Sequence, residues 1–241
     1  MKILVGFCIV TMLLTAATLS AQVPIGAVGN FLAIGNYSNS QGSSDLGAVV
    51  QLEAGGTILI DEGDPVRYFF NQSDNNLEGV TDWMLPGYDA SDWEIGFNAV
   101  GYNANQITEV PDTDDQGAIY TRFQRFDLPN AASITSMTIR IDYDDGVIVW
   151  LNGVEVLRSQ MTTAAAVPGW IWGTAENHES SNKLGPDPSR WDAAVSNLFG
   201  VGQDNPEASI IDYTFDVAFD PTAVEPVDKL TTSWGSIKAH R

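Results

Sequence analysis

Apolar and polar residues alternate along several stretches of this chain. In SMTIRIDY (136–143), the residues Met137, Ile139 and Ile141 fall on one face and Thr138 and Arg140 on the other. A period of two predicts a strand with one buried face. AIYTRFQRFDL (118–128) and ASIIDYTFDVAFDP (208–221) alternate in the same way, and each predicts a further strand.

The stretch IDYDDGVIVWLNGVEVLR (141–158) carries two turn signals, Asp145-Gly146 and Asn152-Gly153. Asn-Gly favours a type I′ hairpin turn, because both residues tolerate positive φ. We therefore predict a three-stranded meander over 136–157. Trp150 alternates with its neighbours and faces opposite to them, on a face that is either packed or open to a ligand.

The first half of the chain shows shorter segments of the same kind. FLAIGNY (31–37) predicts a strand, and AVVQLEAGGTILI (48–60) predicts two strands around Gly55-Gly56. Apart from a weak pattern at 190–198, no stretch of ten or more residues has a helical period, and there is no internal repeat. Many short strands joined by Gly and Asn turns predict an all-β fold, a sandwich or jelly roll.

The first 21 residues have the layout of a secretory signal peptide. Lys2 precedes an apolar run that ends near Leu14, and small residues lead to a cleavage site expected after Ala21. We therefore expect a secreted or cell-surface protein with no membrane insertion after cleavage. Cys8, the only cysteine, would leave with the signal, so no disulfide and no thiol chemistry is expected.

The acidic residues number 31 against 11 basic ones, which gives a formal net charge of −20. A nucleic-acid partner is not expected, because phosphates would be repelled. The charge suits neutral ligands or hard divalent cations such as calcium. Solubility alone also explains it, without any ligand.

Two motifs resemble a known family. They are TDWMLPGYDASDWEIGFNAVGY (81–102) and DDGVIVWLNGVEVLRSQM (144–161), the second followed by TAENHESS (174–181). Together they resemble the galactose-binding-domain-like jelly-roll module of exported bacterial proteins, which is related to the sugar-binding domain of beta-galactosidase-type glycosidases. The resemblance implies a β-sandwich over 61–221, preceded by an N-terminal segment of short strands and loops (22–60) and followed by a tail (222–241).

Sugar binding requires exposed aromatic faces near hydrogen-bonding groups. The candidates are the tryptophans predicted in loops and one loop histidine: Trp83, Trp170, Trp172, Trp191 and His178. Trp93 and Trp150 are expected in the core or sheet instead. Each candidate also has a packing interpretation, and for His178 it is a hydrogen-bonded loop anchor.

The loop PDTDDQG (111–117) resembles the first half of an oxygen-ligand calcium loop. Its candidate ligands are Asp112, Asp114 and Asp115. The residue in the twelfth loop position is Phe123, not the bidentate acid of an EF-hand. A structural calcium ion is thus one interpretation, and a solvated acidic loop is the other.

The motifs of known catalytic centres are missing from the sequence, among them the nucleophile elbow, the zinc-binding His-Glu-x-x-His and the phosphate-binding glycine loop. We therefore expect a non-catalytic binding or adhesion module for carbohydrate or another surface polymer, with a protein partner supplying any enzymatic activity. The alternatives left open are a self-assembling surface protein and, remotely, a small hydrolase that uses His178.

Overall fold

The structure is a computed structural model of the 241-residue chain. It describes residues 22–39, 45–72, 77, 80–103, 106–111, 117–161, 175–176, 178, 180, 191 and 210–223. The predicted signal peptide and most of the predicted tail lie outside the described residues.

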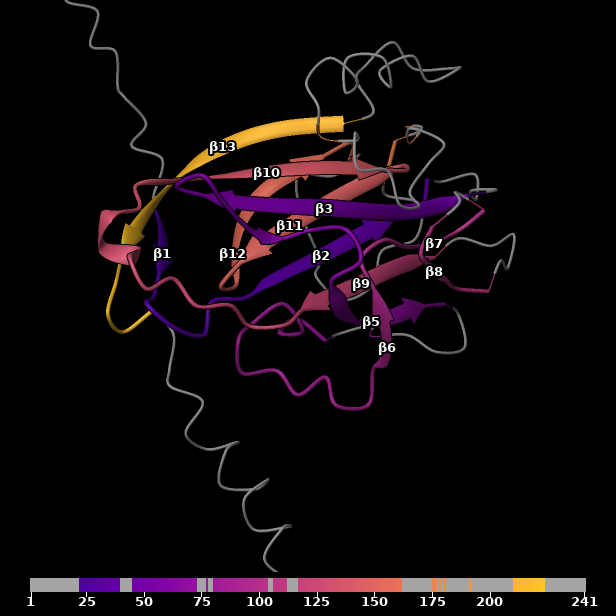
Figure 1. The fold of residues 1–241 in the computed structure, drawn as a ribbon. Helices are drawn as coiled ribbons and strands as arrows, with labels where there is room; N and C mark the ends of the chain where they lie inside the picture. The colour runs from indigo at the N-terminus through magenta and orange to yellow at the C-terminus, as the bar shows by residue number, and fades with distance from the viewer. Residues whose placement is uncertain are drawn as a thin grey trace, which may run out of the picture.

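Two β-sheets pack face to face, as Figure 1 shows. One sheet has seven strands: β1 (Val23–Ile25), β13 (Ile210–Phe219), β10 (Ser136–Tyr143), β3 (Leu46–Ala54), β7 (Val100–Tyr102) and β8 (Thr108–Glu109) in this order, with β4 (Thr57–Ile60) also paired to β3. The other has six, in the order β12 (Val154–Ser159), β11 (Gly146–Leu151), β2 (Leu32–Tyr37), β9 (Ala118–Phe123), β5 (Pro65–Asn71) and β6 (Glu94–Phe97). The only helical element among the described residues is a 3-10 turn, η1 (Ala131–Ser133). The predicted all-β, jelly-roll-like sandwich is confirmed.

The main core lies between the sheets and is built by alternation. Met137, Ile139 and Ile141 of β10 point into it, as their spacing predicts, and they meet Val147 and Val149 of β11 from the other sheet. All five side chains are buried. The burial of these apolar side chains is the main force that holds the two sheets together.

The predicted meander is wrong in one respect. β11 does pair with β12 through the Asn152-Gly153 turn, whose φ angles are 52° and 84°. However, β10 pairs with β3 and β13 and not with β11. The Asp144-Asp145 turn therefore carries the chain from one sheet to the other.

The contacts of the Asp144-Asp145 turn explain the crossing. The Asp145 carboxylate accepts from the backbone N–H and the side-chain amide of Asn39, at 2.9 and 3.0 Å. The Asn36 amide donates to the carbonyls of Asp144 and Gly146. These bonds tie the turn to the end of β2, in the six-stranded sheet.

A second apolar layer covers the outer face of the six-stranded sheet. Ile148 and Trp150 of β11 belong to it, so the two faces of this strand are both buried. The described part of the loop between β5 and β6 supplies Trp83 and Trp93. The face that Trp150 occupies is thus packed, which decides between the two alternatives that the sequence left open, and Trp93 lies in the same apolar layer, as expected.

The strands of residues 22–60 belong to the two sheets of the sandwich. β2 is an inner strand of one sheet and β3 of the other. The boundary expected between residues 60 and 61 therefore does not coincide with an edge of the fold. Within the described residues, no helix is both long enough and apolar enough to cross a membrane.

Candidate functional site

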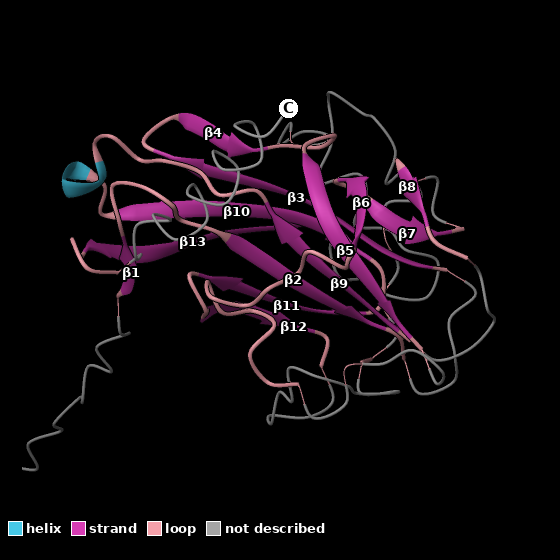
Figure 2. Ribbon diagram, turned by 90° about the horizontal axis from the view of Figure 1, so that it is seen from below, coloured by secondary structure: helices cyan, strands magenta, loops and turns pink. Residues whose placement is uncertain are grey.

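A groove runs along β4 at one edge of the sandwich. It consists of two hollows of about 170 and 210 Å³ that share Leu59. One wall is β4 and the turn after it, and the other is the segment from Phe123 to Ile134, which leaves β9 and crosses toward β10. Figure 2 shows this segment running beside β4 on its way to η1.

Local sequence places both walls. Gly55 and Gly56 have φ of 55° and 79°, a left-handed conformation that turns β4 back onto β3. On the other side, β9 ends at Phe123, five residues before the end of the predicted strand. Beyond it the backbone N–H of Phe126 donates to Asn30 and that of Leu128 to Ala27, which holds the crossing segment in place.

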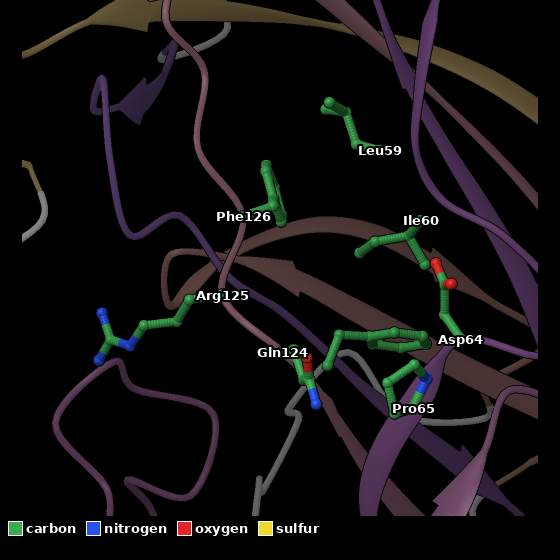
Figure 3. Close-up of a pocket in the computed structure, with 8 residues that line it drawn as sticks. Leu59, Ile60, Asp64, Pro65, Gln124, Arg125 and Phe126 are labelled. Carbon is green, nitrogen blue, oxygen red and sulfur yellow. The ribbon is translucent and has the colours of Figure 1, made fainter. Parts of the chain in front are cut away.

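The first hollow combines apolar and hydrogen-bonding side chains. Leu59, Pro65 and Phe126 supply the apolar part, and Asp64 and Gln124 the polar part. Figure 3 shows Phe126 on one side of the open space, with Leu59 and Ile60 opposite. Gln124 is exposed and its amide makes no hydrogen bond within the described part of the chain. A ligand that enters can therefore contact an apolar surface and a free amide together.

Arg125 lines the same hollow, but its guanidinium is engaged elsewhere. It donates to the carbonyls of Gly29 and Pro86, at 3.0 and 2.6 Å, and it points away from Leu59 and Ile60 (Figure 3). Burial lowers the pKa of this group. The groove is therefore lined by two carboxylates, those of Asp64 and Asp127, against one guanidinium that points away from it.

The second hollow continues the groove toward η1. It is lined by polar groups at Thr57, Asp127, Asn130 and Ser133 and by apolar groups that include Leu128 and Ile134. Together the two hollows, which share Leu59, make an elongated site with mixed chemistry along β4.

The structure corrects the prediction for Trp83. Its side chain is fully buried, stacked on Tyr120 with ring centroids 4.5 Å apart, and in edge contact with Trp150. The loop that carries it folds over the outer face of the six-stranded sheet, so the indole presents no face to a ligand. The prediction of an exposed Trp83 is wrong because the outer face of this sheet is apolar.

His178 is buried as well. Its ring stacks on Tyr143 with centroids 4.2 Å apart and planes within 3°, and its Nδ1 lies 3.1 Å from the Tyr143 carbonyl oxygen. Its own carbonyl accepts from the backbone N–H of Asp145. These contacts are those of a loop anchor, and the ring has no surface for the ligand contact that the sequence also allowed.

The remaining candidates are not brought together. Trp191 is half-buried against Val49 and Ala99, on the outer face of the seven-stranded sheet. The other predicted site residues, Trp170, Trp172, Asp112, Asp114 and Asp115, lie outside the described residues. Within the described ranges no group of three or more His, Cys, Asp or Glu side chains is placed to hold a metal ion.

Sequence reasoning missed every residue of the groove. Leu59 and Gln124 are far apart in the chain, and no motif links them. The one available signal was the polar pair Gln124-Arg125 near the end of the 118–128 stretch. Comparison of the chain with protein-family models, with curated proteins and with solved structures finds no match.

Proposed function

We propose that this protein is a non-catalytic binding module of the cell exterior that holds an extended surface polymer in the groove along β4. The observation that supports the proposal is the elongated site itself, with an apolar side at Leu59 and Phe126 and a free amide at Gln124. Carbohydrate is the polymer that the sequence resemblance implies. A sugar ring offers an apolar face and hydroxyl groups, the two features that such a wall can contact.

The net charge of −20 supports the choice of a ligand without anionic groups. Asp64 and Asp127 carry this charge into the groove itself. Anionic polymers such as nucleic acids and acidic polysaccharides would be repelled there. Neutral polysaccharides are thus the first class to test.

The test is a binding panel of soluble neutral and anionic polysaccharides, with affinities measured by calorimetry. The double variant Gln124→Ala/Phe126→Leu removes the amide and the ring but keeps an apolar side chain at 126. We expect it to bind the preferred polymer at least about tenfold more weakly, a loss of about 1.4 kcal/mol. Asp216→Ala/Tyr213→Leu removes a polar group and an aromatic ring at exposed positions of β13, away from the groove, and should bind as the parent does.

The double variant Trp170→Ala/Trp172→Ala tests the alternative that the polymer binds at these two tryptophans and not in the groove. If binding is lost in this variant and kept in the groove variant, the groove is not the site. If no polymer in the panel binds, the binding function itself is contradicted.

A further inference from the structure

β4 has one unpaired edge. It pairs with β3, in the register Ala54 with Thr57 and Glu53 with Ile58, and with no other strand among the described residues. The same strand forms one wall of the groove along its length. An edge strand presents free N–H and C=O groups, and an extended segment beside it can pair with them as an added strand.

The groove favours a segment with basic and apolar residues. Asp64 and Asp127 line it with carboxylates that each accept one backbone N–H, and the Arg125 guanidinium points away from it. Leu59 and Phe126 offer apolar contact, and Ile58 of β4 is 52% exposed. A matching segment thus needs Lys or Arg, no acids, and bulky apolar side chains.

One segment of this chain has that composition. KLTTSWGSIKAHR (229–241) contains Lys229, Lys238 and Arg241, no acidic residue, and the bulky apolar residues Leu230, Trp234 and Ile237. It lies outside the described residues, so only its sequence enters the argument. In a chain whose net charge is −20, this stretch is the complement of the groove.

The described chain ends close enough for this segment to reach the groove. The N–H of Asp220 donates to the carbonyl of Ile25. Two residues further on, the carbonyl of Ala27 accepts from the N–H of Leu128, which belongs to the groove wall. The N–H of Val217 donates to Thr135, next to Ile134 of the second hollow. Lys229 is six residue steps beyond Ala223, and an extended chain spans about 3.3 Å per step, or about 20 Å in all.

We propose that residues 229–241 add as a strand to the free edge of β4 in the same molecule and fill the groove, so that they compete with the polymer. The competition rests on the proposed function, but the docking of the segment does not. The added strand would gain backbone hydrogen bonds from β4, and the basic groups would lie near Asp64 and Asp127.

The test is hydrogen exchange of the β4 amides in the full chain. In the parent protein, the Thr57–Ile60 amides that point away from β3 should be protected at every protein concentration. Trp234→Ser/Ile237→Ser should raise their exchange rate at least about tenfold, with β12, one of the two edge strands of the other sheet, as an internal reference. Val224→Ser/Val227→Ser makes the same chemical change in the linker and should leave exchange unaltered.

A second pair of variants tests the charge. Asp64→Asn/Asp127→Asn keeps both acceptor groups and removes both charges, and it should also speed exchange at β4. Asp92→Asn/Asp216→Asn removes two exposed charges outside the groove and should not. The Trp234→Ser/Ile237→Ser variant should in addition bind the polymer at least about fivefold more tightly, because the competitor is gone.

Three results would overturn the inference. One is β4 exchange that is unchanged in Trp234→Ser/Ile237→Ser. Another is protection that depends on protein concentration, which would assign the strand to a second copy. The third is tail-dependent protection of β4 without any change in polymer affinity, which would overturn the competition. Failure of the polymer panel alone would leave the β4 result standing, so the two proposals fail separately.

Discussion

The guanidinium of Arg122 donates to the backbone carbonyl of Trp83, and so joins a strand of the six-stranded sheet to the loop that covers it. The same group donates to the carbonyl of Leu85 at 3.1 Å and lies 4.4 Å from the centre of the Phe31 ring. Arg122 is buried. A charged group in this position is stabilised only because its donors are used, and it fixes the path of the covering loop.

Arg122→Met should therefore lower the free energy of unfolding by about 3 kcal/mol, because buried carbonyls lose a charged donor. Urea denaturation at pH 7 measures this. The control is Arg158→Met, which breaks a partly exposed pair with Glu155 and should cost less than about 1 kcal/mol. Equal losses in the two variants would contradict the anchoring role of Arg122.

Tyr37 should weaken the fold in alkaline solution. Burial raises the pKa of its hydroxyl above the ordinary value of 10.0, so above pH 10 the folded chain keeps a proton that the unfolded chain has lost. The free energy of unfolding then falls as the pH rises beyond 10. Tyr120, whose pKa burial also raises, acts in the same direction.

Arg122 acts in the opposite direction in this range. Burial, and secondarily the charge of Arg125, lowers the pKa of Arg122 to about 10 from an ordinary value of 12.5. Between these two values the unfolded chain holds the extra proton, so this group makes stability rise with pH. The net slope above pH 10 is therefore the tyrosine decline reduced by the arginine contribution.

Tyr37→Phe isolates the tyrosine contribution. The variant should make the alkaline decline shallower by up to about 1.4 kcal/mol per pH unit. At pH 7 it should cost nothing, because the buried hydroxyl has no hydrogen-bond partner among the residues that the structure describes. Denaturant melts between pH 7 and 11 measure both effects, with exposed Tyr213→Phe as the control. A Tyr37→Phe protein that loses stability at pH 7 would show that the hydroxyl does bond.

Asn152 combines turn geometry with three hydrogen bonds. Its φ is 52°, and its side chain accepts from the N–H of Phe31 and donates to Pro24 and to Asn30. Asn152→Gly keeps the turn and removes the bonds, and it should cost about 2 kcal/mol. Asn152→Ala adds backbone strain of about 1 kcal/mol to that loss. Thermal melts that rank Asn152→Gly equal to the parent would reduce the role of Asn152 to turn geometry alone.

Gly146 lies at the point where the chain passes between the sheets. A Cβ there would come 2.6 Å from the Cβ of Ala175 and 2.8 Å from the carbonyl oxygen of Gln160. Gly146→Ala should therefore destabilise the protein by about 1–3 kcal/mol, because the backbone must shift. Gly87→Ala is the matched control, since its Cβ would meet nothing within 4 Å. A Gly146→Ala protein as stable as the parent would mean that Gln160 and Ala175, which surround position 146, are not held rigidly.

Alternation along the chain predicted most strands well. β10 spans the expected residues, and β13 lies within its predicted stretch, because a period of two directly reflects one buried face. The Asn152-Gly153 hairpin was predictable for the same local reason. The strand that pairs with β10 was not predictable, because the Asp145-Gly146 signal is equally compatible with a hairpin and with a crossing between sheets. Bonds to Asn39, about 100 residues away, determine the outcome.

The burial of Trp83 had a signal in a different segment. Val147 to Leu151 is apolar at every position, which is typical of a strand buried on both faces. A cover for the outer face was therefore required, and the aromatic loop supplies it. The groove could not be foreseen, because Leu59 and Gln124 meet only through the tertiary fold.

The most direct test of the central claim is an amide chemical-shift map of the full chain, titrated with the tightest-binding polymer of the panel. We predict that the largest changes fall on Thr57–Pro65 and on residues 124–134, the two walls of the groove. Saturable binding with changes confined to other segments, such as the loop with Trp170 and Trp172, would contradict the account.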